Sequence, residues 1–279
     1  MTSVRRALTL MAALFWLVVL ASPGLSAPVT VICPVEPLSH LARLIGGDRI
    51  RVVTLIPRGA DPHSFEMRPS HAKAVSEARG ALRLGLPLED RLLPKMRQRG
   101  VRIFQLKFDP LYDGHRHLDP HAWTSVRNGM SMARSMAEAF AELDPAGAKA
   151  YRASLSNVLS RMRDLDRRMG DDLSPFKGRG ILSYHPSWNY LCQERGLVPL
   201  SVEVHGSEAG PRHISRLKDR ISREDIKVMF VEPSKAGKSA ASAARALGVS
   251  LVELDPMGDD WFAMMEGALA AFRSALSGR

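Results

Sequence analysis

The sequence predicts an α/β fold with two similar lobes, each a mostly parallel four-stranded sheet covered by helices, joined by one long rigid helix. Two observations predict this. Short β-branched runs alternate with amphipathic helical runs in both halves of the chain, a pattern typical of parallel sheets covered on both faces. Between the halves, a single apolar stripe at helical spacing runs from Ala148 to Met169 without glycine or proline.

Residues 1–27 are predicted to be a leader and not part of the folded protein. Arg5 and Arg6 precede an apolar run at residues 7–21, and small residues follow up to Ala27, which is the layout of a cleavable secretory signal peptide. The run has about 15 apolar residues, which is short for a membrane span. An uncleaved anchor is the alternative. We therefore expect an exported, periplasmic product.

Residues 28–143 are predicted to form the N-terminal lobe. The chain here alternates β-branched runs with helical runs, and Gly46-Gly47 ends the first helix. The expected strands are residues 29–32, 50–56, 81–86 and 101–106, and the expected helices are residues 37–45, 70–78, 91–97 and 126–140.

Residues 144–174 are predicted to form the connecting helix. Asp144 is expected to be the N-cap, with Pro145 in the first turn. At 1.5 Å per residue the helix is on the order of 40 Å long, enough to run from one lobe to the other. Its methionines are interpreted as packing residues.

Residues 175–279 are predicted to form the C-terminal lobe, in which the alternation starts again. The expected strands are residues 181–184, 198–204, 228–231 and 249–254, and the expected helices are residues 189–195, 213–221, 236–247 and 261–276.

Charge and cysteine content narrow the function classes. The formal net charge is +10, but the basic residues are scattered and the few aromatic residues are not interleaved with them, so nucleic-acid binding is weakly supported. The default interpretation of the positive charge is a solvated surface, and binding to an anionic membrane surface is also compatible with it. Cys33 and Cys192 either pair or stay as thiols, and two cysteines are too few for a thiolate metal cluster.

Four metal-binding side chains are expected at or just past strand ends, and each lies beside a proline. They are His63, His121, His185 and Asp255. The tripeptide Asp-Pro-His occurs twice, at residues 61–63 and 119–121, and its proline presents each imidazole from a stiff turn. Three imidazoles and one carboxylate suit Zn²⁺ in preference to Mn²⁺. The alternatives are ordinary turns with surface histidines, a structural His185 and a turn-capping Asp255.

The remaining histidines and nearby acids are expected to have other roles. His115 and His117 are expected to be solvated, and Glu66, Glu203 and Glu232 are expected to be solvent-facing or structural, with orientation of an imidazole as the alternative. The histidines expected to be structural are His40, His71, His205 and His213.

Several motifs together resemble the metal-binding solute receptors of ABC importers, in the zinc/manganese branch. They occupy residues 59–66, 119–123, 143–145, 230–233 and 254–256. The resemblance implies two lobes joined by one long helix, with the ion in the cleft between them. It implies His63 and His121 as ligands from the first lobe, and His185 and Asp255 from the second. Manganese-type members tend to have Glu where His185 stands, so the resemblance favours zinc.

The same resemblance implies a monomeric periplasmic receptor that passes Zn²⁺ to an ABC permease and its ATPase. The stiff connecting helix predicts a small change on binding. Metal affinity should fall as the pH drops through ~6.5, the reference pKa of imidazole. The long His- and acid-rich loop of zinc-type members is reduced here to residues 114–117. The alternatives are an exported zinc-dependent hydrolase with an open metal position and an adhesion protein with an incidental metal site.

Overall fold

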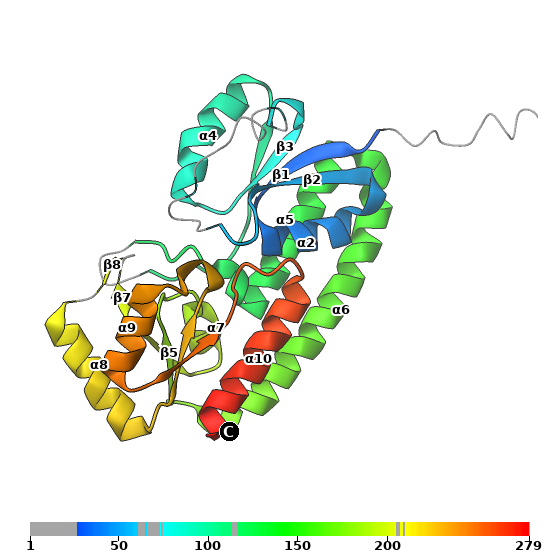
Figure 1. The fold of residues 1–279 in the computed structure, drawn as a ribbon. Helices are drawn as coiled ribbons and strands as arrows, with labels where there is room; N and C mark the ends of the chain where they lie inside the picture. The colour runs from blue at the N-terminus through cyan, green and yellow to red at the C-terminus, as the bar shows by residue number, and fades with distance from the viewer. Residues whose placement is uncertain are drawn as a thin grey trace, which may run out of the picture.

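The computed structural model describes residues 27–60, 65, 73, 75–112, 117–204, 207–208 and 210–278. They form two lobes built on separate four-stranded parallel sheets (Figure 1). The first sheet has the order β2-β1-β3-β4 and the second has the order β10-β9-β5-β6. In both sheets the second strand of the lobe lies outside the first, and the third and fourth follow on the other side. The two lobes therefore share one topology, as the alternating sequence pattern predicts.

The N-terminal sheet consists of β1 (Val29–Val35), β2 (Ile50–Ile56), β3 (Gly80–Arg83) and β4 (Arg102–Gln105). β1 is buried almost throughout, because it is a central strand with β2 on one side and β3 on the other. It leads directly into α2 (Glu36–Gly46), which begins with a proline in its first turn and ends at Gly47 with φ at 52°. Helix α4 (Pro87–Gln98) connects β3 with β4.

The C-terminal sheet consists of β5 (Gly180–Ser183), β6 (Val198–Ser201), β9 (Val228–Val231) and β10 (Ser250–Glu253). The helices of this lobe are α7 (Asn189–Glu194), α8 (Pro211–Glu224) and α9 (Lys238–Leu247). A short antiparallel pair, β7 (Glu203–Val204) with β8 (Ser207–Glu208), follows β6. The predicted strand at residues 198–204 is thus divided between β6 and β7.

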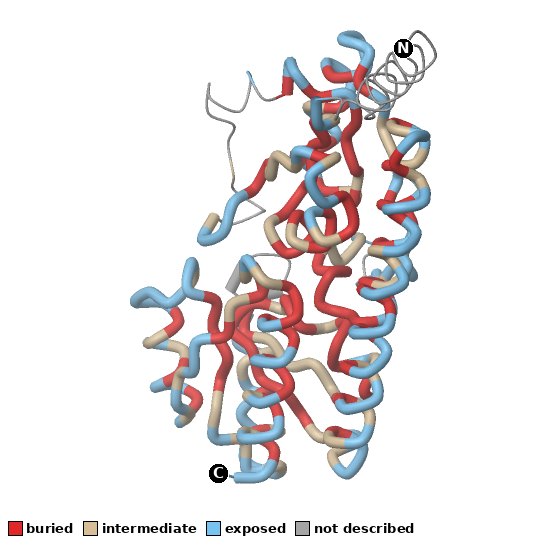
Figure 2. The backbone as a smooth tube through the Cα atoms, turned by 90° about the vertical axis from the view of Figure 1, so that its right-hand side faces the viewer, coloured by how far each residue is buried: buried red, intermediate tan, exposed pale blue. Residues whose placement is uncertain are grey.

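Three helices tie the lobes together. Helix α5 (Val126–Leu143) belongs to the N-terminal lobe, and α6 (Ala148–Leu173) runs from that lobe along the C-terminal lobe (Figure 1). Helix α10 (Trp261–Ser277) lies beside α6 and contacts α2 as well. One apolar cluster includes strand residues of both sheets, such as Ile32 and Phe230, together with these helices. Figure 2 shows the buried chain continuing between the lobes.

A second, smaller apolar cluster lies within the C-terminal lobe, where the other face of its sheet packs against α8 and α9. Leu217 and Ile221 of α8 belong to it, and the outer side of that helix is exposed. The sheet is therefore covered on both faces, as expected for parallel strands.

Several finer expectations have a clear outcome. Cys33 and Cys192 are both buried free thiols, and burial raises the pKa of Cys33 to about 12. Asp144 begins a short 3₁₀ turn and not the long helix, and its carboxylate instead accepts from Arg49 and Tyr151. Within the described residues, none of the helices is both long enough and apolar enough to cross a bilayer. The leader lies outside those residues, except for Ala27.

Candidate metal centre

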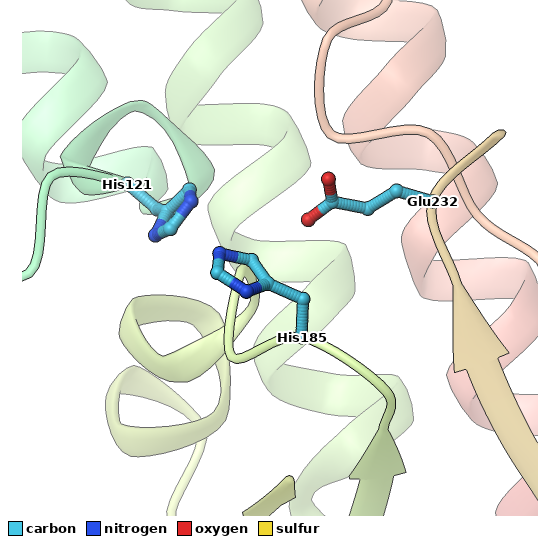
Figure 3. A group of neighbouring side chains, drawn as sticks. All are labelled: His121, His185 and Glu232. Carbon is cyan, nitrogen blue, oxygen red and sulfur yellow. The ribbon is translucent and has the colours of Figure 1, made fainter. Parts of the chain in front are cut away.

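Two imidazoles and one carboxylate from distant segments meet where the two lobes face each other. His121, His185 and Glu232 place one potential ligand atom each within 4.8 Å of the others. Figure 3 shows the three side chains pointing toward one another from three separate segments. All are buried, with exposed fractions of 3%, 3% and 6%. Within the described chain, this group has the residue types and the spacing of a metal-binding site.

His121 comes from the N-terminal lobe, at the start of the 3₁₀ turn Ala122–Thr124 that leads into α5. Its ring Nδ1 lies 2.8 Å from Oδ1 of Asp119, and the same oxygen accepts the backbone N–H of His121 at 2.9 Å. The Thr124 hydroxyl donates to the carbonyl of His121. The ring also lies against Trp123, with 5.3 Å between the ring centroids. The imidazole is therefore held by the turn that follows Pro120.

His185 comes from the C-terminal lobe, two residues after β5. Its Nδ1 lies 2.7 Å from Oε2 of Glu203, a residue 18 positions further along the chain. Lys235 Nζ lies 3.3 Å from the same oxygen. The pairing of β5 with β6 brings Glu203 next to His185, because Glu203 N donates to the carbonyl of Tyr184. Glu203 was expected to be solvent-facing or structural, and it instead orients an imidazole.

Both imidazoles have the same electronic arrangement. An ionised carboxylate only accepts hydrogen bonds, so each bond to it places the ring proton on Nδ1. Nε2 is then the nitrogen with a lone pair for a metal ion, and the carboxylate increases its basicity. The centroids of the two imidazoles are 5.2 Å apart.

The two supporting carboxyl groups have lowered pKa values. For Asp119, burial raises the pKa, but the hydrogen bonds from His121 and Asn189 outweigh it. For Glu203, burial also raises the pKa, and the bond from His185 and the charge of Lys235 outweigh it. Both groups are therefore anionic at neutral pH, which is the form that accepts the ring N–H.

Glu232 was expected to be solvent-facing or structural, but it is a buried member of the group. It follows β9, whereas His185 follows β5, and these strands are adjacent in the sheet. Adjacent first and third strands mark the topological switch point, where open α/β sheets place their ligands. The Ser187 hydroxyl donates to Oε1 of Glu232. Sequence position close to a strand end was the available signal for Glu232.

The structure brings together two of the four predicted ligands, His121 and His185. His63 lies outside the described residues. Asp255 is described, but it is not in the group: Oδ1 accepts from Met257 N at 2.8 Å, and Oδ2 lies 3.3 Å from Arg58 Nε. Arg58 belongs to the segment that leads toward His63. The next residue, Pro256, accepts the indole N–H of Trp123 at 2.7 Å, so the Asp255 segment borders the loop of His121.

The other expectations for histidines and acids are tested in part. His40 accepts from Trp261 N at 2.9 Å, and His213 Nε2 lies 2.7 Å from the carbonyl of Ser201, so both have structural contacts as expected. His117 is exposed, in line with a solvated position. The residues outside the described chain are His71, His115, His205 and Glu66.

Comparisons with known proteins point to a single family. Residues 31–275 match the profile described as "Zinc-uptake complex component A periplasmic", ZnuA. A "Putative metal-binding protein" of Chlamydia muridarum is 25% identical over 87% of this chain and 90% of its own. The "Manganese-binding lipoprotein MntA" of Halalkalibacterium halodurans is 28% identical over 86% of both chains. A crystal structure of ZnuA is 28% identical, with a TM-score of 0.82 over 89% of this chain and 99% of that one.

Proposed function

We propose that the cargo of this protein is Zn²⁺, on the premise that the chain belongs to the family of periplasmic zinc-uptake components. It is a metal-binding substrate receptor of the ABC-importer type. The family works with a membrane permease and an ATPase, and its members are receptors and not enzymes. The identity of the ion is the part that we propose, because one of the named relatives is a manganese-binding lipoprotein.

The observation that carries the proposal is the pair of buried imidazoles, one from each lobe, each with a carboxylate on Nδ1. This arrangement supplies two neutral nitrogen ligands in a fixed orientation. Nitrogen ligands suit a borderline cation such as Zn²⁺, whereas Mn²⁺ prefers sites dominated by oxygen. The third imidazole of the proposed set, His63, would weight the site further toward nitrogen.

The acidic ligand has two candidates. Asp255 is the one that the family resemblance implies, although its carboxylate lies against Arg58 and Met257 N in the structure. Glu232 is the one whose position beside both imidazoles supports it. We propose the set His63, His121, His185 and Asp255, and separate variants Asp255→Asn and Glu232→Gln decide between the two carboxylates. The variant that loses more zinc affinity identifies the ligand.

Native mass spectrometry and equilibrium titration test the proposed cargo. The purified protein should bind one Zn²⁺ per chain, and more tightly than Mn²⁺. His121→Ala and His185→Ala should each weaken zinc binding more than the roughly 10–100-fold that loss of an outer partner costs. His213→Ala is the matched control, because His213 contacts the Ser201 carbonyl and is not a member of the buried group. Zinc retained in His121→Ala, or a preference for Mn²⁺, would overturn the proposal.

The biological setting follows from the same proposal. The protein acts as a monomer in the periplasm, after export through the leader at residues 1–27, and delivers zinc to its permease. The alternative of a zinc hydrolase has no support from the family or from the named relatives, which are receptors.

A further inference from the structure

The segment that carries His185 also contacts the loop that carries His121. Asn189 and Tyr190, the first residues of α7, follow His185 within five positions. Asn189 Nδ2 donates to Oδ2 of Asp119 at 3.0 Å, and the Tyr190 hydroxyl donates to the carbonyl of Asp119 at 2.9 Å. Asp119 is the residue that orients His121. A short segment of the C-terminal lobe therefore holds the support of an imidazole in the N-terminal lobe.

The two carboxylate oxygens of Asp119 form hydrogen bonds with different lobes. Oδ1 bonds the ring and the backbone N–H of His121, within the N-terminal lobe. Oδ2 accepts from Asn189, in the C-terminal lobe. With both oxygens bonded, the carboxylate plane cannot rotate without losing a hydrogen bond, and the ring that it bonds keeps its orientation and its tautomer.

Tyr190 holds the backbone of the same loop. Its hydroxyl accepts from Leu111 N at 2.9 Å while donating to the Asp119 carbonyl, and Asp119 N donates to the Leu111 carbonyl at 2.9 Å. Leu111 and Asp119 are thus bonded to each other directly, and both are bonded to the phenol hydroxyl of Tyr190. Tyr190 is only 4% exposed, so these bonds are shielded from water.

Three more hydrogen bonds connect the same two segments. Thr124 Oγ1 lies 3.1 Å from the carbonyl of Ser187. The carboxylate of Glu194, at the end of α7, accepts the backbone N–H groups of Val126 and Arg127 at 3.1 Å each. These N–H groups are at the start of α5, where a helix leaves donors without partners of its own. The contact between the two segments is therefore continuous from His185 to Glu194.

We infer that Asn189 and Tyr190 are positioning residues that hold His121 and His185 as a preformed pair across the two lobes. The inference rests on the proposed function, since it concerns how the same ion is held. A preformed pair binds an ion without the loss of conformational entropy that ordering its side chains would otherwise require. Loss of either bond releases the Asp119 loop, so that the metal dissociates faster from a less ordered site.

The test combines Asn189→Ala and Tyr190→Phe with matched controls on nearby exposed residues. Gln193→Ala removes an amide from the same helix, and Tyr112→Phe removes a hydroxyl from a phenol that is 61% exposed. Stopped-flow chelation should show zinc leaving both test variants faster, by on the order of tenfold, the lower end of the effect of outer partners on metal affinity. The controls should match the wild type.

A second readout separates positioning from general stability. In the zinc-free wild type, long-range ¹H–¹⁵N spectra should show the His121 ring with its proton on Nδ1. In both test variants a second tautomer should become populated. Unchanged His121 signals together with wild-type zinc dissociation would overturn the inference, even if the melting temperature falls. If the wild type fails to bind zinc, the proposed function fails, while the ring signals of the zinc-free protein still decide the positioning role.

Discussion

The two lobes have the same strand order but use the loops at the ends of their central strands differently. In the C-terminal lobe these loops carry His185, after β5, and Glu232, after β9. At the equivalent positions of the N-terminal lobe, the carboxylates are engaged in local hydrogen bonds. After β1, Glu36 begins α2 and its carboxylate accepts from Arg43 and Thr54. After β3, the carboxylate of Glu89 accepts the backbone N–H groups of Leu84, Gly85 and Leu86.

The difference shows that a repeated topology does not produce a repeated site. Among the described residues, the imidazole that the N-terminal lobe contributes to the group is His121, in the Asp119-Pro120-His121 turn beyond β4. That imidazole has a local carboxylate partner, two residues away, whereas His185 depends on a partner brought to it by the sheet. Each lobe therefore positions its imidazole by a different kind of contact.

The largest effect is expected from removing either of two fully buried tryptophans that form hydrogen bonds between the lobes. Trp123 donates its indole N–H to Pro256, and Trp261 donates its own to the carbonyl of Trp123. Substitution of either by alanine should lower the free energy of unfolding by about 3–5 kcal/mol. Only Trp123→Ala should also weaken zinc binding, because Trp123 lies against His121. Urea denaturation and zinc titration measure both, and equal losses of zinc affinity would contradict this asymmetry.

The next test compares the two supporting carboxylates. Asp119→Asn and Glu203→Gln should each reduce zinc affinity by roughly 10–100-fold, because each removes the charge that orients an imidazole. Asp119→Asn should have the larger effect, since its carboxylate also accepts from the backbone of His121 and from Asn189. Competition with a chelator of known affinity measures the two constants. The reverse order would indicate that the sheet-mediated partner dominates.

A third test concerns Asp144 in the N-terminal lobe, which bonds Arg49, in the turn before β2, and Tyr151 of the long helix. The Arg49 guanidinium, at 2.7 and 2.9 Å, is the main cause that holds the pKa of Asp144 below its usual range. A lowered folded pKa adds stability that is present above the unfolded value of ~3.9 and is lost as the pH falls through the folded value. Asp144→Asn should therefore destabilise the protein at neutral pH and reduce its acid sensitivity below about pH 4.

Melting curves between neutral and acidic pH measure that effect. Asp164→Asn is the control, because its side chain is 68% exposed on α6. An Asp144→Asn variant with wild-type stability at neutral pH would show that Asp144 does not anchor the N-terminal lobe.

The smallest effect is expected where α10 meets α6 at the surface. Arg168 pairs with Glu266, and Arg273 pairs with Asp172, with side chains between 35% and 57% exposed. Solvent screens such pairs, so double-mutant cycles on unfolding should give coupling energies below about 1 kcal/mol. A larger coupling would mean that charge, and not the buried face of α10, holds the lobes together.

Much of the fold was predictable because it depends on local patterns. Short apolar runs mark the strands of both sheets, and an uninterrupted apolar stripe marks α6, since these patterns follow from burial of a strand or of one helix face. Asp144 stands at the start of the 3₁₀ turn that leads into α6, but its carboxylate makes no capping bond, because it bonds Arg49, 95 residues away. No local pattern reveals such a distant partner.

The site was predictable only where its contacts are local. The Asp-Pro-His turn indicates His121, and a strand end followed by proline indicates His185. Glu203, Asn189 and Tyr190 carry no such signal, because their roles depend on which strands and loops the fold places side by side. Glu232 was recognised as an acid near the site, but its burial comes from the adjacency of β5 and β9.

The apolar cluster that includes both Ile32 and Phe230 has a consequence for protein engineering. If the chain were divided between the two lobes, each fragment would expose an apolar surface to water. Neither fragment is expected to remain folded and soluble by itself, and exchange of one lobe with that of a relative would require the facing helices to be exchanged with it.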